Sequence, residues 1–508
     1  MFLFNNGSDL GIAEQKTFQR LITERTGIVL LDHQLNNLQT TIEKACLRFG
    51  YNSSSDYLRK LRDEVSLSPE FEFLIDAITV GESYFFRDVA QMELLKGNLL
   101  PEIIARKRQE KDYSLRIWSA GCSNGQEIYS LVIMLHELLP DIKDWTLHFL
   151  ATDINTEVLA NAIRGHFREW SFRATSTELK NKYFTPVDQE YALDKRLCEC
   201  VKFTYLNLSE DIFPSILSQT HALDLILCRN VFIYIEPKTI QLIMNRFSNC
   251  LVNGGILLLG PSDHISGSIK DLNHVQRGGT SYFKKVSALP DVNEGLWPIS
   301  VSLENSEPLI DFTAATHTVK QPNDVLNVVA QETHSTKKAQ EYSGLKLFDQ
   351  IIQMLREELW TDVLEVIKQA ENEQGTSADL WQIKANALAN LGLLDESLQA
   401  CQQSLALDPC DKHTYLIQGI VYIEQNQQQL AEIALRKAIY LDHTFAEAHY
   451  HLGLLLLRVS KPDAGLKSLT NALALVEQGD PQRELHNALG MVYSRFAEIL
   501  RNEISIYK

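Results

Sequence analysis

An apolar stretch that runs into a glycine-containing turn, and then into an amphipathic segment, constrains the fold of this chain more than any other feature. The stretch begins at Arg116, and the turn has the pattern Gly121-x-x-x-Gly125. Because glycine carries no Cβ, such a turn lets backbone N–H groups and a helix N-terminus approach a bound nucleotide-like ligand. Asp153 ends a second apolar run, where an acid can accept hydrogen bonds from ribose hydroxyls. The pattern predicts a nucleotide-type site in an α/β domain.

Strand-like and helix-like segments alternate between about residues 80 and 286, which predicts a mainly parallel sheet covered by helices on both faces. The segment 165–200 breaks this alternation and predicts a small subdomain inserted at the sheet edge. We expect Gly254-Gly255 to end the last helix. The expected strands are 115–119, 147–152, 201–206, 223–228 and 255–260, and the expected helices lie near 90–107, 125–139, 155–163 and 237–252.

The regions on either side of this domain have different patterns. Apolar residues recur at helical spacing from about residue 10 to residue 75, which predicts a small helical domain. Prolines and polar residues dominate 287–342, which predicts a linker. The resulting domain limits are 1–76 for the helical domain, 77–286 for the α/β domain, 287–342 for the linker and 343–508 for an all-α domain.

A repeat of 34 residues fills most of the last domain. Small residues recur at equivalent places, for example Ala385, Gly419 and Gly453, and would let paired helices cross closely. This pattern resembles the tetratricopeptide repeat. We expect a hairpin and a closing helix pair to cap the stack. The three repeat units are 378–411, 412–445 and 446–479, the hairpin is 345–376, and the closing pair follows residue 481.

Composition excludes several classes of protein. The 508-residue chain has a net charge of −17 and no long basic block, which argues against general nucleic-acid binding. No run of about 18 apolar residues is present, so no membrane span is expected. The eight cysteines are scattered and suggest neither a disulfide framework nor a zinc site. His449 and His451 diverge on a helix, so we expect no metal. These features indicate a cytoplasmic protein.

The glycine turn and Asp153 are compatible with either a dinucleotide or S-adenosylmethionine. A dinucleotide site requires G-x-G-x-x-G with an acid about 20 residues onward, whereas here the acid lies more than 30 residues beyond Gly121. Glu127, in the first turn of the helix, would repel a pyrophosphate but could hold the ammonium group of a methionine moiety. The sequence therefore favours S-adenosylmethionine.

Four motifs stand in order along the chain: Ile78-Thr-Val-Gly-Glu-Ser-Tyr-Phe-Phe-Arg-Asp88, Trp118-Ser-Ala-Gly-Cys-Ser-Asn-Gly-Gln-Glu127, Ala151-Thr-Asp-Ile-Asn155 and Cys228-Arg-Asn-Val-Phe-Ile-Tyr234. In order and spacing they resemble those of the chemotaxis receptor glutamate O-methyltransferase family, often called CheR. The resemblance covers roughly residues 10–286 and implies a Rossmann-like methyltransferase domain behind an N-terminal helical domain. The added repeats resemble a known variant of the family.

The resemblance implies a role for each matched residue. Arg87 and Tyr234 would be catalytic, Glu127 would contact the methionine amine, and Asp153 would contact the ribose. The remaining cofactor contacts would lie near the donor, on the adenine side and in a segment that closes over the cofactor: Gly81 and Ser83, Asn207 and Leu208, and Arg229 and Asn230, with Arg87 contacting the donor as well. The family usually has Asn at position 81, Pro at position 128 and Gly-His-Ser-Glu at 260–263.

Five of these residues also have a purely structural interpretation. Arg87 could be a salt-bridge partner, Tyr234 could pack in the core, and Glu127 could be a solvated first-turn acid. Asp153 could cap a helix, and Asn207 could form a turn.

The resemblance implies methylation of glutamates on the cytoplasmic helices of methyl-accepting receptors, with no insertion into the membrane and no nucleic-acid partner. The segment 183–193 lacks the glycine-containing loop of family members that tether to a receptor tail, and the N-terminal domain is not strongly basic. The repeats would therefore supply localisation, by binding an unidentified protein or the enzyme's own catalytic domain. A donor-sensing scaffold without catalysis is the alternative from another class. Methylation of another protein or of a small acid is the alternative among enzymes.

Overall fold

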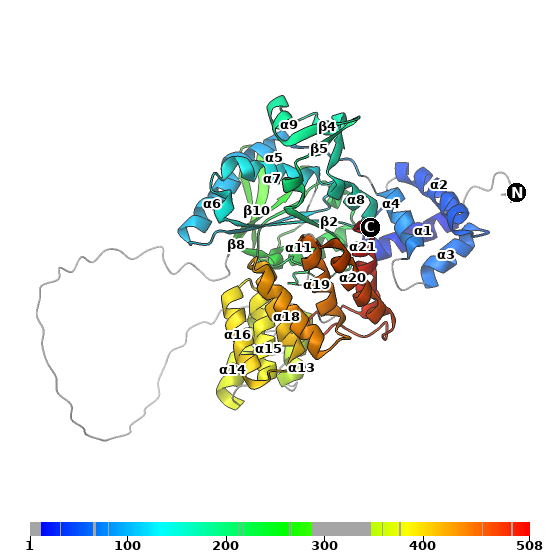
Figure 1. The fold of residues 1–508 in the computed structure, drawn as a ribbon. Coiled ribbons are helices and arrows are strands. Elements are labelled where there is room, and N and C mark those ends of the chain that lie inside the picture. Colours follow the sequence, from blue (N-terminus) through cyan, green and yellow to red (C-terminus); the bar gives the residue numbers. More distant parts are fainter. Residues whose placement is uncertain are drawn as a thin grey trace, which may run out of the picture.

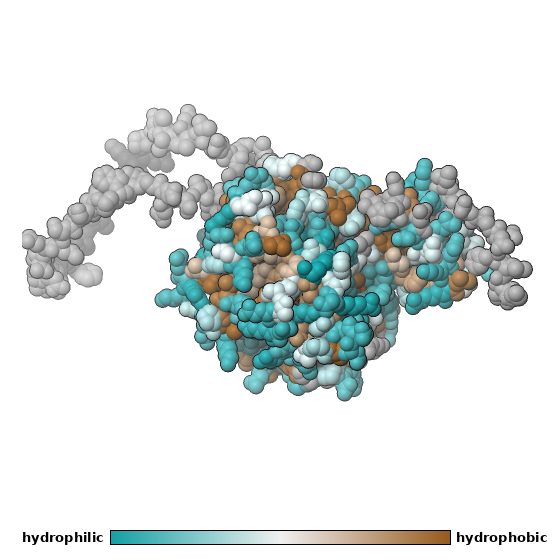
Figure 2. Space-filling view, turned by 90° about the horizontal axis from the view of Figure 1, so that it is seen from above, coloured by the Kyte–Doolittle hydropathy of each residue, from teal (hydrophilic) through white to brown (hydrophobic). Residues whose placement is uncertain are grey.

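The computed structural model describes residues 12–30, 32–63, 68–79, 81–211, 213–216, 218–263, 265, 267–286, 347–357, 359–374, 377–459, 461–488 and 491–507. The expected linker therefore lies outside the described residues. Figure 1 shows a small helical domain that projects to one side, a central α/β domain, and a stack of paired helices against the α/β domain. Figure 2, seen from above, shows the same projection and a surface that is mostly hydrophilic with scattered hydrophobic residues.

Four helices form the N-terminal domain, and Ser68 shows how the local sequence specifies the last of them. The Ser68 hydroxyl accepts a hydrogen bond from the backbone N–H of Phe71 at 3.3 Å, and Pro69 occupies the first helical position. Phe71 and Leu74 are then buried on one face of this helix. The helices are α1 (Ile12–Thr26), α2 (Asp32–Phe49), α3 (Ser54–Asp63) and α4 (Pro69–Ile78).

The central domain has a seven-stranded sheet of order β6-β2-β1-β7-β8-β10-β9, in which the first five strands are parallel and the last two are antiparallel. The predicted parallel sheet and its five strands are confirmed. The prediction that Gly254-Gly255 ends a helix is wrong, because the helix ends at Cys250 and both glycines lie inside β8. The strands are β1 (Ser114–Ala120), β2 (Thr146–Asp153), β6 (Val201–Tyr205), β7 (Leu223–Cys228), β8 (Leu251–Leu259), β9 (Leu272–Arg277) and β10 (Thr280–Lys285).

Helices cover the sheet, and a small second sheet stands at its edge. A five-residue π-helical segment, η1 (Leu95–Leu99), joins the first two helices of this domain, which end at Leu94 and begin at Leu100. The small sheet has the order β3-β5-β4 and falls within the segment where an inserted subdomain was expected. The helices are α5 (Val89–Leu94), α6 (Leu100–Gln109), α7 (Gln126–Leu138), α8 (Thr156–Arg164) and α11 (Pro237–Cys250), and the small subdomain contains β3 (His166–Arg168), α9 (Thr177–Tyr183), β4 (Phe184–Val187), β5 (Glu190–Leu193) and α10 (Lys195–Cys198). Three short 3-10 segments complete the domain: η2 (Ile142–Asp144), η3 (Glu169–Phe172) and η4 (Phe232–Tyr234).

The connection from β6 to β7 differs from the other crossovers, because its described residues, 206–211, 213–216 and 218–222, form no helix. Phe213 in this connection packs edge-on against Trp118, with 5.4 Å between ring centroids. Without a crossover helix, part of the β2 and β6 face must be covered by another part of the chain. His148 on β2 and Lys202 on β6 are on this face.

Three antiparallel helix pairs form the repeat domain, in the three units that the 34-residue period predicts. A Cβ at Gly419 would lie 2.8 Å from Leu435, and a Cβ at Gly453 would lie 2.8 Å from Leu469, so glycine is required where the paired helices cross. The pairs are α15 (Ala378–Asn390) with α16 (Leu394–Leu407), α17 (Lys412–Glu424) with α18 (Gln428–Leu441), and α19 (Ala446–Arg458) with α20 (Pro462–Glu477).

The two ends of the stack are capped differently. The expected hairpin before the repeats is present as α13 (Leu347–Arg356) and α14 (Trp360–Gln374). The expected closing pair is wrong in one respect. Among the described residues after 481, only α21 (Tyr493–Ile506) is helical, and the irregular segment before it is held by a bridge between Glu484 and Val492.

The repeat domain covers the open part of the sheet through a buried ion pair. Glu424, at the end of α17 and 2% exposed, pairs with Arg116 of β1 and accepts a hydrogen bond from Gln219 Nε2 at 2.6 Å. His148 Nδ1 lies 3.9 Å from the same carboxylate. Burial alone would raise the pKa of Glu424, but the adjacent Arg116 guanidinium outweighs it and holds that pKa well below its usual range.

The last helix, α21, adds a second polar contact to the same sheet. Glu503 accepts a hydrogen bond from the hydroxyl of Thr204 on β6. Arg495 Nε donates to Asp211 Oδ1 at 2.7 Å, in the irregular connection after β6. The repeat domain is therefore packed against the seven-stranded sheet at both strand and loop positions. No helix among the described residues is long and apolar enough to cross a membrane.

Candidate active site

The residues predicted from sequence to form the site come together at the carboxyl ends of β1, β2, β6 and β7. One cavity is lined by Ser83, Arg87, Glu127, Asp153, Asn207, Leu208, Arg229, Asn230 and Tyr234, together with Thr26, Ile28 and Gln34 of the helical domain. Gly81 is the one predicted residue outside this lining. The cavity therefore lies where ligands bind in open α/β sheets, with the helical domain along one side.

The glycine turn after β1 is shaped by close contact with the segment after β7. Gly121 has a φ of +76°, and a Cβ there would lie 2.4 Å from Cγ2 of Val231. The backbone N–H groups of Gly121 and Cys122 both donate to the Thr152 carbonyl, at 2.8 and 2.9 Å. The turn therefore needs glycine at this position, and it is tied directly to the end of β2.

Asp153 ends β2 and faces the cavity. Its Oδ2 accepts the backbone N–H of Ser123 at 2.8 Å, and its Oδ1 accepts that of Asn155 at 3.0 Å. Burial raises the pKa of Asp153 above its usual value, and the N–H groups of Asn155, Ser123 and Ile154 oppose that rise. The helix cap itself is Asn155, whose side chain accepts the N–H of Val158 at 2.9 Å. Asp153 therefore remains available to the cavity, as each oxygen retains a lone pair.

Glu127 and Arg229 form the charged centre of the site. Glu127 Oε1 accepts from the Ser119 hydroxyl at 2.7 Å, and Oε2 accepts from Arg229 Nη1 at 3.0 Å. The Arg229 side chain is 1% exposed, and it also donates to Gln91 Oε1 at 2.7 Å and to the Arg87 carbonyl at 2.6 Å. Arg229 therefore joins the first turn of α7 to the loop that carries Arg87, and its own donors are committed to protein groups.

The loop before α5 is held against the glycine turn through its backbone. The Gly81 carbonyl accepts from Ser123 Oγ at 3.0 Å and from Asn124 Nδ2 at 2.9 Å. A Cβ at position 81 would lie 3.2 Å from Val158, so a larger side chain here would require a small shift. Arg87 Nη1 donates to the Glu82 carbonyl at 3.1 Å, and the guanidinium lies 5.7 Å from the centre of the Tyr84 ring.

Asn207 lines the cavity, but its side chain is used to form a turn. The side-chain Nδ2 donates to the Arg25 carbonyl of α1 at 2.7 Å, and Oδ1 accepts from the Ser209 hydroxyl at 2.8 Å. Its backbone N–H donates to Asp211 Oδ2 at 2.5 Å. The turn positions Leu208 in the lining and fixes the helical domain beside the site.

Asp263 is a residue of the site that sequence reasoning did not assign. Its Oδ2 accepts the N–H groups of Asn230 at 2.6 Å and Gly260 at 2.9 Å, and its Oδ1 accepts that of Ile233 at 3.2 Å. Asn230 has a φ of +60°, so this carboxylate stabilises a backbone turn that few side chains favour. The Tyr234 carbonyl then accepts the N–H of Val29 at 2.7 Å, which ties the segment to the helical domain.

Signals for the unassigned residues were weak. Asp263 stands in the segment that the family resemblance singled out, but as a departure from the usual Glu. Gln91 Nε2 donates to the Leu259 carbonyl at 2.7 Å while its Oε1 supports Arg229, and an isolated Gln in a helix carries no motif. Both residues act through other residues, which a sequence pattern does not reveal.

Two family models match this chain over the domains that build the site. The model for the SAM binding domain of CheR methyltransferase matches residues 81–280, and the model for its all-alpha domain matches residues 13–79. The fold and the site thus define a methyltransferase whose methyl donor is S-adenosylmethionine. The chain belongs to the CheR methyltransferase family.

Curated relatives agree with this assignment. Chemotaxis protein methyltransferase 2 of Vibrio cholerae is 34% identical over 237 residues, which are 46% of this chain and 80% of the relative. The chemotaxis protein methyltransferase of Borreliella burgdorferi is 29% identical over 274 residues, which are 54% of this chain and 95% of the relative. These alignments cover about half of this chain.

Solved structures also include proteins similar to this chain over a smaller part. A thermophilic TPR protein of Thermus thermophilus is 19% identical, and the match covers 25% of this chain and 72% of the Thermus chain, with a TM-score of 0.24. A crystal structure of MamA is 21% identical and covers 28% of this chain and 85% of its own, also with a TM-score of 0.24. The identification of tetratricopeptide repeats rests on the period and the helix pairs described above.

The residues around the cavity fit S-adenosylmethionine. The close approach of Gly121 to Val231 leaves no room for a side chain in the turn, and two acids line the cavity: Asp153 at the end of β2 and Glu127 in the first turn of α7. When bound, this donor supplies an electrophilic methyl group on a sulfonium. Carboxylates suit the hydroxyl and ammonium groups at the two ends of such a molecule, and Arg229 keeps Glu127 in position.

Proposed function

We propose that this chain transfers a methyl group from S-adenosylmethionine to glutamate side chains on the cytoplasmic helices of methyl-accepting receptors. The observation that carries the proposal is the presence of Arg87 and Tyr234 in the same cavity as Asp153 and Glu127. A cation and a phenol then stand beside the donor acids, where an anionic substrate side chain would enter. The names of the relatives, as chemotaxis protein methyltransferases, support a receptor substrate.

The proposed roles of the site residues follow from the chemistry. A glutamate side chain has a pKa of about 4.3, so it is ionised at neutral pH and needs no strong general base. Arg87 orients this carboxylate, and Tyr234 helps to place the methyl group for in-line attack. Because opposite charges disappear along the reaction path, a site partly cleared of water favours transfer through alignment and reduced solvation. Asp153 holds the ribose and Glu127 holds the amine of the donor.

Four further residues contact the cofactor in this proposal. Gly81 and Ser83 lie near the donor, Leu208 contacts the adenine side, and Asn230 belongs to the segment that closes over the cofactor. Arg229 and Asn207 contribute by holding neighbours in place, because their side chains hydrogen-bond protein groups. We also propose that the domain limits are 1–76, 77–286, 287–342 and 343–508.

The test uses labelled S-adenosylmethionine and purified cytoplasmic fragments of receptors. Label on the receptor that base releases as methanol identifies a carboxyl methyl ester. Arg87→Ala and Tyr234→Phe should lower turnover more than they weaken donor binding, and Lys437→Gln on α18 serves as a control. Base-stable label, or label on small acids alone, would contradict the proposal. Full rates in both Arg87→Ala and Tyr234→Phe would remove the assigned roles.

The repeats support a second, protein-binding role for the chain. On α18, Leu430, Ile433 and Tyr440 are 45%, 65% and 82% exposed and follow one another at helical spacing. Large apolar side chains at this exposure suit a protein partner rather than water. Ile433→Asp combined with Tyr440→Asp should release such a partner from the full chain without changing methyl transfer to receptor fragments. Loss of transfer in that variant would place these residues in the function of the catalytic domain instead.

A further inference from the structure

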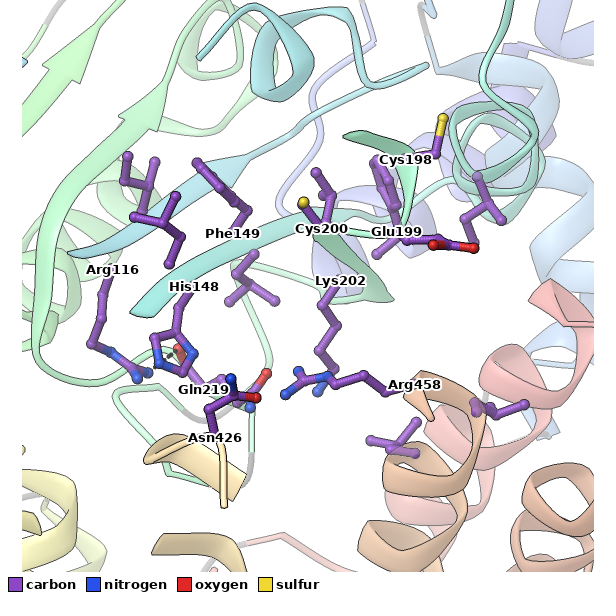
Figure 3. Close-up of a pocket in the computed structure, with 18 of the residues that line it drawn as sticks. Arg116, His148, Phe149, Cys198, Glu199, Cys200, Lys202, Gln219, Asn426 and Arg458 are labelled. Atoms are coloured by element: carbon purple, nitrogen blue, oxygen red, sulfur yellow. Dashed lines mark hydrogen bonds between the residues drawn. The ribbon is translucent and has the colours of Figure 1, made fainter. Parts of the chain in front are cut away.

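A large cavity separates the catalytic sheet from the repeats that cover it. Its volume is about 970 Å³, and its walls come from β1, β2 and β6 on one side and from α17 and α19 on the other. Figure 3 shows Lys202 extending from its strand into this space and Arg458 extending toward it from a helix of the repeat domain. The cavity shares no lining residue with the active site, which opens at the carboxyl ends of the strands.

The charge of this cavity is opposite to that of the molecule as a whole. The chain has a net charge of −17, yet among the described residues only one acid, Glu199, lines the cavity. Six lysines and arginines line it: Arg116, Lys143, Arg164, Lys195, Lys202 and Arg458. Lys143, Arg164, Lys195 and Arg458 are exposed at its boundary, and such a concentration of positive charge attracts anions.

Lys202 and Arg458 are the central pair, because their side chains approach one another in the cavity (Figure 3) and two other cations of the lining already have partners. Arg116 pairs with Glu424, and Lys195 lies 3.5 Å from Glu199. Neither Lys202 nor Arg458 has an ion pair within 4.0 Å among the residues that the structure describes. Burial lowers the pKa of Lys202 to about 8, with Arg458 contributing to the decrease. Two like charges are thus held near one another without a neutralising neighbour in contact.

Nearby acids compensate these cations only in part. Glu503 and Glu424 both act to raise the pKa of Lys202, and neither is within ion-pair distance of it. Burial raises the pKa of Glu503 above its usual value, which favours its neutral form. Glu424 is committed to Arg116. The cavity therefore retains positive charge at neutral pH.

An unpartnered histidine in the wall points independently to a ligand. His451 of α19 is 4% exposed, and its Nε2 has no hydrogen-bond partner among the described residues. Burial lowers the pKa of His451 to about 3, so the ring is neutral and can offer one N–H. Buried polar atoms without partners are rare in folded proteins, and they commonly mark a place for water, an ion or a ligand.

The rest of the cavity suits a ligand that has an apolar part as well. Ile423, Leu454 and Leu455 line it from the repeats, and Leu147 lines it from β2. Asn426 and Arg458 are exposed at the boundary, so the cavity is accessible from solvent. A volume of several hundred Å³ with apolar walls and a few convergent polar groups is typical of small-molecule sites.

We propose that this interdomain cavity binds a nucleotide-sized molecule carrying a phosphate or diphosphate group, with Lys202 and Arg458 holding the phosphates. The planar guanidinium of Arg458 can donate two parallel hydrogen bonds to phosphate oxygens, and the Lys202 ammonium acts as a point charge. His451 donates a further hydrogen bond, and the aliphatic wall packs against the base. Because one cation comes from each domain, the ligand binds the docked arrangement and stabilises it.

The test is calorimetric titration of the full chain with ADP, inorganic pyrophosphate, adenosine and succinate. S-adenosylhomocysteine is present at saturation, so that the active site is occupied. We expect ADP to bind more tightly than pyrophosphate or adenosine, and to raise the midpoint temperature of unfolding. Lys202→Gln and Arg458→Gln should each weaken ADP binding at least tenfold, and Lys437→Gln, an exposed cation on α18, should leave it unchanged. Arg458 is exposed, so its variant tests the site even if Lys202→Gln does not fold.

Three outcomes would overturn the proposal. Absence of binding by both ADP and pyrophosphate would show that the cavity holds only water. Binding that is equal in Arg458→Gln and the unsubstituted chain would place the phosphate elsewhere on the protein. Tighter binding of succinate than of ADP would replace the phosphate with a dicarboxylate.

Discussion

The two cavities of this enzyme lie on one sheet and differ in how they treat charge. In the active site the buried cation, Arg229, is paired with Glu127, and Asp153, which has no ion pair among the described residues, faces the open space. In the interdomain cavity the buried acid, Glu424, is fully paired, and the cations Lys202 and Arg458 face the open space. Pairing of one sign leaves the opposite sign for a ligand. The first cavity therefore suits a cationic donor, and the second suits an anion.

The largest effect should follow from breaking the paired cation of the active site. Arg229→Met leaves Glu127 and Asp88 without their partner and should cost about 3–5 kcal/mol of stability, with loss of donor binding. Arg59→Met, which breaks an exposed pair, should cost less than about 1 kcal/mol. Urea unfolding, monitored by tryptophan fluorescence, measures the loss of stability. Titration with S-adenosylhomocysteine measures the loss of binding.

A double variant sharpens this prediction. Adding Glu127→Gln to Arg229→Met removes the uncompensated charge, so part of the lost stability should return. If Arg229→Met alone unfolded at the same urea concentration as the unsubstituted protein, the cation would not organise the site.

The next effect should come from the paired acid of the interdomain cavity. Glu424→Gln leaves Arg116 without its partner and should weaken docking of the repeats by about 3 kcal/mol. Hydrogen exchange should then increase in β1, β2 and β6, while donor binding stays unchanged. Glu432→Gln, which removes an exposed pair with Arg436, is the matched control and should change neither. Equal protection of the three strands in both variants would contradict the prediction.

Acid should weaken docking of the repeats against the sheet. Burial lowers the pKa of His148 to about 4 and that of His221 to about 3, so both are neutral when the domains are docked. Because the open form takes up protons below pH 6.5, docking weakens as pH falls from 6.5 toward 4, by about 2 kcal/mol for His148 at pH 5.

Glu424 adds nothing to this pH dependence, because its lowered pKa keeps it ionised when the domains are docked. Its stabilising effect is lost only below the ordinary pKa of a glutamate. Hydrogen exchange of β2 between pH 7 and pH 5 measures the change. His148→Gln should flatten the profile, and an unaltered slope in this variant would assign the effect to other groups.

The smallest effect should follow from a single acid of the active site. Asp153→Asn keeps the size of the side chain but removes its charge, and should weaken donor binding about tenfold, or about 1.4 kcal/mol. Asp144→Asn, in the exposed 3-10 segment η2 beyond the site, is the control. Calorimetric titration with S-adenosylhomocysteine distinguishes the two. Unchanged affinity in Asp153→Asn would leave this residue with only its structural hydrogen bonds.

Much of the fold could be predicted because buried parallel strands are read as short apolar runs. The strand 223–228 was predicted with the limits that the structure has. The glycine pair at 254–255 misled the prediction, because glycine also fits inside a strand that approaches other backbone closely: a Cβ at Gly255 would lie 2.8 Å from the Val252 carbonyl. The hairpin of β9 and β10 was missed because both strands are half polar, and β9 forms the edge of the sheet, where polar residues are common.

The active site was predictable to the extent that its residues belong to contiguous motifs. The structure places Arg87, Asp153 and Tyr234 in one cavity, as their motifs indicated. The interdomain cavity had no such signal. Arg116 and Glu424 are separated by 308 positions, and a lysine on a strand, such as Lys202, is ordinarily read as solvent-exposed. Only the missing crossover helix, which became visible with the fold, explains why these polar side chains are covered.

That missing helix has a consequence for how the polypeptide can be divided. Since the tetratricopeptide stack takes the place of a secondary-structure layer, it acts as an internal subunit of the enzyme rather than an appendage. A polypeptide cleaved between residues 286 and 347 should migrate as a single particle, because noncovalent contacts such as Arg116 with Glu424 do not depend on the connecting peptide. Expressed alone, the N-terminal fragment should aggregate through its uncovered sheet, and coexpression with the C-terminal fragment should restore it.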